Sequence, residues 1–206
     1  MQNTVPVESE VAQRALATRR QQYESEVRRL IDAAFEVMSR TSEIDPQVRD
    51  IVKASGLSNQ AFYRHFSSKD ALMLAVLADG QRQLVEYLQR RTVSATGPRE
   101  QVSRWIEGMM AQARNHAAAD RTRPFAINAP RLADRFPDEL AASRAELVET
   151  LAPSVRALGG SRQDAAFICD LALARMNDAI THRRRPHPDE VKQLISFCIA
   201  GIHHGT

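Results

Sequence analysis

The chain has few aromatic residues and only two cysteines. Phe, Trp and Tyr make up 5% of its 206 residues, whereas Ala, Leu and Arg are frequent, a balance that favours helices over sheets. Cys169 and Cys198 lie within apolar helical patterns without a CxxC or Cys/His ligand spacing. We therefore expect an all-α protein with two buried free thiols, in keeping with a reducing compartment.

Long apolar runs and enzyme signatures are also missing. No run approaches the ~18 apolar residues of a membrane span, and the N-terminus lacks the apolar core of a signal peptide. The sequence contains no G-x-G-x-x-G, P-loop, G-x-S-x-G or H-E-x-x-H motif. Nothing fixes the mutual geometry of His182, His187, His203 and His204, so we interpret them as surface residues. We expect a cytoplasmic protein with no membrane contact, no enzyme activity, no cofactor and no metal site.

The small positive charge is not concentrated in either half of the chain. Residues 1–91 hold 13 Lys and Arg against 12 Asp and Glu, and residues 92–206 hold 15 against 13. Any basic surface for nucleic acid must therefore be local. Four cations fall in or beside the segment described next: Arg49, Lys53, Arg64 and Lys69.

Residues 47–69, QVRDIVKASGLSNQAFYRHFSSK, have the pattern of a helix-turn-helix. A short apolar-patterned helix precedes Gly56, which suits the left-handed backbone that ends a helix. Ser58 can accept a hydrogen bond from an amide at the start of the second helix. The exposed side of that helix combines amides, which read adenine edges, with Tyr, Arg and His, which suit guanine or phosphate. This face is typical of a major-groove reader.

Four segments resemble the tetracycline-repressor (TetR) family of bacterial regulators: RRLIDAAFEVM (28–38), VRDIV (48–52), GLSNQAFYRHFSSKDAL (56–72) and the long helix that follows. The resemblance covers roughly the first 90 residues. It implies that Asn59 and Gln60 read bases, that Tyr63, His65 and Lys69 contact phosphates, that Arg49 adds a contact from the preceding helix, and that Arg64 serves in either role. Asp45-Pro46 departs from the family pattern, and we expect Asp45 to cap a helix with Pro46 in its first turn.

The chain divides, on this interpretation, into an N-terminal extension (1–24), a three-helix helix-turn-helix DNA-binding domain (25–70) and a C-terminal helical domain for effector binding and dimerisation (71–206). Two alternatives remain for the extension. It is a frayed tail or a helical extension without a binding role, or it is an arm whose Arg14, Arg19 and Arg20 reach DNA. Apolar spacing predicts the remaining helices at about 68–91, around 102–113, at about 125–134, 138–158, 162–183 and 188–203.

The resemblance further implies a cavity for a small effector in the C-terminal domain. Individually its apolar residues are more often core than pocket, but a Met-rich lining suits an irregular apolar guest. The candidate effector-binding residues are Trp105, Met109, Met110, His116, Phe125, Asn128, Phe167, Met176 and Asn177.

We therefore predict a ligand-responsive DNA-binding regulator, most simply a repressor. It would bind double-stranded DNA at an inverted-repeat operator as a homodimer and be released by a small, largely apolar effector. The last two helices carry more apolar surface than one subunit can cover, and Ile195 and Ile199 are expected on the dimer-forming face. The alternative is a DNA-binding regulator without a small-molecule effector, controlled by a protein partner or by its own abundance.

Overall fold

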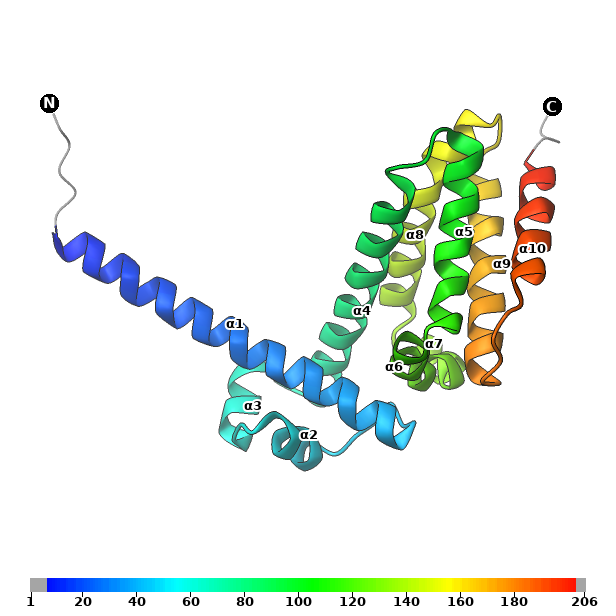
Figure 1. The fold of residues 1–206 in the computed structure, drawn as a ribbon. Helices are drawn as coiled ribbons and strands as arrows, with labels where there is room; N and C mark the ends of the chain where they lie inside the picture. The colour runs from blue at the N-terminus through cyan, green and yellow to red at the C-terminus, as the bar shows by residue number, and fades with distance from the viewer. Residues whose placement is uncertain (1–6, 203–206) are drawn as a thin grey trace, which may run out of the picture.

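The computed structural model describes residues 7–202, and all regular structure in that range is α-helical (Figure 1). This confirms the predicted all-α fold. The helices, in chain order, are α1 (Val7–Thr41), α2 (Val48–Ser55), α3 (Asn59–His65), α4 (Lys69–Thr92), α5 (Pro98–Arg114), α6 (His116–Ile127), α7 (Ala129–Arg135), α8 (Pro137–Ala157), α9 (Arg162–Thr181) and α10 (Pro188–Gly201).

Two hydrophobic clusters hold these helices together. The head cluster comprises buried residues of α1, α2, α3 and the first half of α4, together with Leu132 of α7 and Phe136, which follows α7. The body cluster comprises the second half of α4 with α5, α8, α9 and α10. Helix α4 belongs to both clusters, and Figure 1 shows it rising from the head to run beside α5 and α8. Movement of α4 therefore changes both clusters.

Helix α1 buries an apolar stripe whose residues recur at helical spacing. Leu30, Ile31, Ala34, Phe35 and Met38 are all buried in the head cluster. The helix nevertheless begins far before this stripe, and residues 12–25 are exposed along the projecting part seen in Figure 1. Within the described residues, the N-terminal extension is thus a continuation of α1.

The turn between α2 and α3 forms as expected. Gly56 has φ +65°, the left-handed conformation in which a side chain would be strained. The Ser58 hydroxyl accepts a hydrogen bond of 3.1 Å from the amide of Ala61 and so caps α3. These two residues fix where one short helix ends and the next begins.

The predicted cap at Asp45 is wrong. Helix α2 begins at Val48, and its N-cap residue Gln47 makes no side-chain capping bond. The Asp45 carboxylate instead accepts a hydrogen bond of 2.8 Å from Lys69 Nζ. A bond between two charged groups is stronger than a bond to a neutral backbone amide, which accounts for this choice.

The single short helix predicted at 125–134 is also wrong, because the segment forms α6 and α7. Asn115 caps α6 by accepting from the amide of Ala118 at 3.1 Å, so the helix starts well before the proline-rich part. Pro124 is accommodated inside α6, and its carbonyl accepts a hydrogen bond of 2.8 Å from Asn128 Nδ2. Pro130 lies in the first turn of α7, where no amide is needed.

The last three predicted helices are confirmed as α8, α9 and α10, with ends shifted by a few residues. His203 and His204 lie outside the described residues. Cys169 and Cys198 are buried free thiols, and burial raises their pKa values to about 12 and about 11. Within residues 7–202, no helix is both long and apolar enough to cross a membrane.

Candidate nucleic-acid interface and effector cavity

Helix α3 presents a polar face to solvent. Asn59, Gln60, Tyr63 and Arg64 are exposed, Tyr63 to 59%, while Ala61 and Phe62 hold the opposite side in the core. On a helix, residues three and four apart share a face, so Gln60, Tyr63 and Arg64 point the same way. The structure thus brings four of the predicted DNA contacts together on one short, well-capped helix.

Arg49 lies on α2 and is also available to a partner. Its side chain is largely exposed and makes only a loose ion pair of 3.7 Å with the neighbouring Asp50. Ala61 of α3, in contrast, is buried against the core and is not available to DNA.

His65 is not placed for the predicted phosphate contact. Its side chain is 1% exposed, and Nε2 lies 2.7 Å from Glu26 Oε2 of α1. The Tyr23 ring packs against it edge-on, with ring centroids 4.4 Å apart. Burial and the carboxylate together hold the imidazole inside, so His65 fastens α3 to α1 instead of reaching DNA.

Glu26 joins two residues of α3, which nothing in its sequence context indicates. Glu26 Oε2, the oxygen next to His65 Nε2, also accepts a hydrogen bond from the Arg64 guanidinium. The bonds from His65 and then Arg64 lower the pKa of Glu26 to about 2, so the carboxylate stays charged throughout the neutral range. Arg64 is consequently oriented by α1, although it remains exposed.

Lys69, another predicted phosphate contact, is engaged within the chain. Its partner Asp45 also lies 3.8 Å from Arg131 and 3.9 Å from Arg135, both on α7. Arg135 pairs in addition with Asp70 at the start of α4. Through these ion pairs, α7 is linked to Asp45, before α2, and to Lys69 and Asp70, at the start of α4.

A cavity with a volume of about 680 Å³ lies between the head and the body. Such a volume is in the usual range for small-molecule sites. Its wall comes from α4, α5, α6 and α8, with Met176 from α9 and Phe35 from α1. The lining residues are Phe35, Val76, Leu77, Gly80, Gln81, Gln83, Leu84, Glu86, Tyr87, Arg90, Ala111, Gln112, Asn115, Ala117, Ala118, Arg121, Thr122, Phe125, Leu140, Ser143 and Met176.

Only two of the predicted effector-binding residues, Phe125 and Met176, line this cavity. Trp105, Met109 and Met110 instead fill the body cluster, where all three are buried. The indole of Trp105 donates a hydrogen bond of 2.8 Å to Thr150 Oγ1, which satisfies its one polar atom. These three residues therefore act as core.

The remaining predicted effector contacts face elsewhere. His116 is exposed at the first position of α6, and Asn128 bonds the carbonyls of Pro124 and Ser42 at 2.8 and 3.5 Å. Asn177 does not line the cavity, and Phe167 is 61% exposed on α9. The polar lining supplied by α4 and α6 was missed, because polar helix positions resemble an ordinary solvent-facing side.

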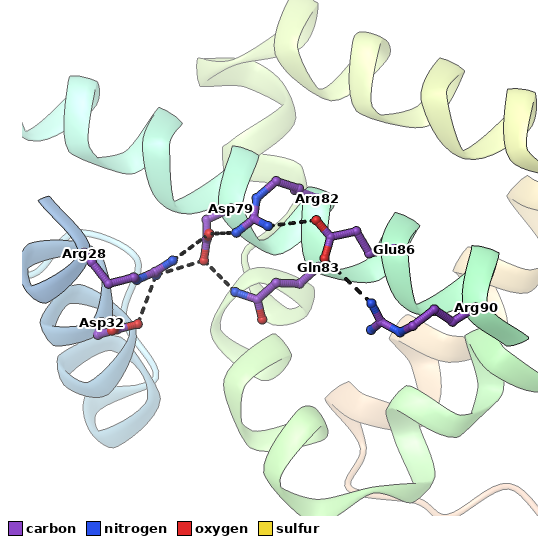
Figure 2. A network of polar contacts seen from close by, with 7 residues as sticks. All are labelled: Arg28, Asp32, Asp79, Arg82, Gln83, Glu86 and Arg90. Atoms are coloured by element: carbon purple, nitrogen blue, oxygen red, sulfur yellow. Dashed lines mark hydrogen bonds and ion pairs between the residues drawn. The ribbon is translucent and has the colours of Figure 1, made fainter. Parts of the chain in front are cut away.

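A chain of polar contacts runs along α4 beside the cavity (Figure 2). Arg28 of α1 donates to both oxygens of Asp79, at 2.7 and 2.9 Å, and Gln83 donates to Asp79 Oδ2 at 2.6 Å. Arg82 bridges Asp79 and Glu86 with two bonds of 2.8 Å. The Arg28 bond lowers the pKa of the buried Asp79 to about 2. The contacts thus connect α1 to two residues that line the cavity, Gln83 and Glu86.

Comparison with known proteins agrees with this geometry. Residues 30–76 match the family described as bacterial regulatory proteins, tetR family. Among curated proteins, no sequence matches the chain significantly.

Several solved structures share the fold over most of both chains. A TetR-like transcriptional regulator from Rhodococcus sp. RHA1 is 21% identical with a TM-score of 0.64, covering 87% of this chain and 97% of the other. FadR, a fatty acid degradation regulator from Bacillus halodurans, is 18% identical with a TM-score of 0.66, covering 87% and 97%. GusR from Salmonella enterica is 20% identical with a TM-score of 0.61, covering 86% and 94%. Residues 30–76 thus match the model of tetR-family regulatory proteins, and over most of its length the chain has the fold of the solved TetR-family regulators.

Proposed function

We propose that the chain is a ligand-responsive repressor that binds an inverted-repeat operator as a homodimer and is released by a small effector. Residues 25–70 would form the DNA-binding domain, and residues 71–206 the effector-binding and dimerisation domain. The observation that carries this proposal is the position of the cavity, whose wall joins Phe35 of the head to helices of the body.

The DNA contacts proposed are Arg49, Asn59, Gln60, Tyr63 and Arg64. All five are exposed on α2 and α3. Their chemistry suits base edges and phosphates in a major groove. Lys69 joins them when a phosphate competes successfully with Asp45 for its ammonium group.

Dimerisation is supported by two large apolar side chains on the outer side of the body. Phe167 on α9 is 61% exposed and Phe197 on α10 is 70% exposed. Large exposed aromatic side chains are typical of protein interfaces, and a two-fold dimer would cover both faces at once. Two copies of α3 would then lie about one DNA turn apart, ~34–36 Å, or a multiple of it.

The effector would act by population shift. A molecule in the cavity touches Phe35 of α1 as well as α4, α5 and α6. A change in the relative position of head and body therefore alters its contacts, so it binds one arrangement more tightly than another. That differential alone sets how far operator affinity changes.

The reading face is tested by selecting bound sequences from a random DNA pool and titrating the recovered operator at several salt concentrations. Gln60→Ala is expected to relax base preference at a cost of ~1–3 kcal/mol, because an amide reads a base edge. Tyr63→Ala is expected to weaken binding to all sequences alike, because a hydroxyl on phosphate carries no sequence information. Unchanged operator affinity in both variants would contradict the proposed face.

A further inference from the structure

The cavity is elongated, and one of its ends is apolar. Its residues on α4 extend from Val76 to Arg90, a rise of ~21 Å along the helix axis. Beside Arg121, which stacks on Phe35, the end next to the head is walled by apolar side chains that belong to the head cluster or pack against it, namely Phe35, Val76, Leu77, Phe125 and Leu140. A long, mostly apolar molecule matches this shape and lining better than a compact polar one.

The charged groups of the wall are unequal in number. Arg90 and Arg121 are cations, and Glu86 is the one anion among the lining residues that the structure describes. Arg90 lies 3.8 Å from Glu86, which Arg82 of the same helix also holds at 2.8 Å. The remaining cation is Arg121, and the lining as a whole carries one net positive charge.

Arg121 makes no ion pair with any carboxylate in the described part of the chain. Its guanidinium carbon lies 4.7 Å from the centre of the Phe35 ring, so the group rests on an aromatic face of α1. Stacking of this kind leaves the in-plane N–H groups of a guanidinium available as donors. A guanidinium with available donors at the edge of an apolar cavity is suited to a carboxylate, which it can bind through two parallel hydrogen bonds.

We propose that the effector is an elongated, mostly apolar molecule with a single negative charge, and that Arg121 binds its carboxylate. This proposal rests on the proposed function, because it names the chemical class of the effector of that same cavity. A single negative charge matches the net charge of the lining. A doubly charged group would exceed the net charge of the lining.

The same placement links the ligand to the DNA-binding head at two points. A carboxylate held by Arg121 lies on the cation that covers Phe35 of α1. Farther along the cavity, Gln83 donates to Asp79, which holds Arg28 of α1 (Figure 2). The bound molecule therefore lies beside both of these contacts with α1.

The test compares three probes of equal chain length, decanoate, decanol and decylamine, by calorimetric titration of the full-length protein below micelle-forming concentrations. Decanoate is expected to bind about tenfold or more tightly than decanol, because a charge-assisted bond is added. Decylamine is expected to bind most weakly. Equal affinity for the three probes, or no binding of decanoate, would overturn the proposal.

Arg121→Gln is expected to lower decanoate affinity to the level of decanol and to leave decanol affinity unchanged. The unchanged decanol affinity also shows that the variant is folded with its cavity intact. Arg114→Gln is the matched control, since it removes the same charge from an exposed position on α5 outside the cavity wall. A preference for decanoate that survives Arg121→Gln, or is lost in Arg114→Gln, would refute the role of Arg121.

Titration of the selected operator with and without decanoate separates this inference from the proposed function. Arg121-dependent binding of decanoate without any change in operator affinity would support the ligand class and contradict the ligand-responsive role. Tight operator binding together with a cavity that prefers decanol would contradict the ligand class and leave the DNA-binding role standing.

Discussion

Asp45 neutralises cations from two distant parts of the chain. Its carboxylate is 2.8 Å from Lys69 and within 4 Å of Arg131 and Arg135. The hydrogen bond from Lys69, aided by the charges of the two arginines, lowers the pKa of Asp45. A phosphate at Lys69, the proposed DNA contact, would therefore compete with this carboxylate.

Asp45→Asn is expected to raise affinity for all DNA sequences several-fold at low salt, because it frees Lys69 and removes a negative charge. The partly exposed ion pair contributes only about 0–1 kcal/mol to stability, so the melting temperature should change little. Salt-dependent DNA titration and chemical denaturation measure both quantities. Lys69→Ala is the opposing control and should lower affinity; an Asp45→Asn variant with weaker DNA binding would contradict this account.

Asp79 makes the stability of the α1–α4 contact dependent on pH. Its pKa falls from 3.8 to about 2, chiefly through the bond from Arg28. Since the folded-state pKa is the lower one, the stabilisation is complete above pH 3.8 and is lost as the pH falls toward 2.

Asp79→Asn is expected to lower the free energy of unfolding by about 1–3 kcal/mol at neutral pH. Denaturation between pH 5 and 2 should then show a shallower fall for Asp79→Asn than for the unchanged chain, and equal slopes would contradict it.

At the scale of elements, α7 completes the core of the head although it lies far along the chain. Leu132 and Phe136 are buried in the head cluster, beside residues of α1 and α4. Arg135 adds an ion pair to Asp70. The hydrophobic core of the head therefore needs residues from α7 as well as from α1 to α4. Helices α6 and α7 connect the cavity wall to this core.

Phe136→Ala is expected to destabilise the protein by ~3–5 kcal/mol, because it leaves a cavity in the head cluster. Operator affinity should fall as well, since α1 and α4 position α3. Ala133→Ser, on the exposed side of α7, is the control and should leave both unchanged. Loss of stability with intact DNA binding at low temperature would mean that α7 does not support the head.

The helix-turn-helix was predictable because its signals are local. The left-handed Gly56, the cap at Ser58 and the apolar stripe of α1 each depend on residues a few positions apart. The partner of His65 is 39 residues away on α1, and neither residue type nor periodicity indicates it. The cavity is formed by five helices and α1, so its lining depends on packing that no single helical pattern contains.

At the scale of the whole molecule, α9 and α10 each carry a large exposed apolar side chain, Phe167 and Phe197, but not where periodicity places it. Ile199 is buried in the body cluster, and Ile195 is partly buried against it. Phe197, between them on α10, is the residue that points outward. A broad apolar stripe shows that a helix is buried on one side without showing which edge faces a second subunit. A charge at Ile199 would thus disrupt the fold rather than test the dimer.

Phe197→Asp is expected to convert the proposed dimer to a monomer and to weaken operator binding, while helical content is retained. The reason is that a buried, unpaired carboxylate at an interface is strongly unfavourable. Sedimentation analysis beside DNA titration measures both effects. Ala141→Asp, an equal charge on the exposed side of α8, is the control. A wild-type chain that is monomeric at micromolar concentration and binds a single half-site tightly would contradict the dimer.

Helix α1 is ~52 Å long, and only its second half is packed against other helices. The packed half acts as a stable nucleus, so the exposed turns of residues 12–22, which precede the contact of Tyr23 with His65, need only propagation. Propagation near room temperature is almost balanced, and no buried contact makes it cooperative with the core. The projecting turns therefore follow helix–coil statistics and shorten gradually from their free end on warming. Helix α1 therefore has two kinds of behaviour. Its packed half unfolds together with the rest of the protein, whereas the helical length of its projecting half depends on temperature.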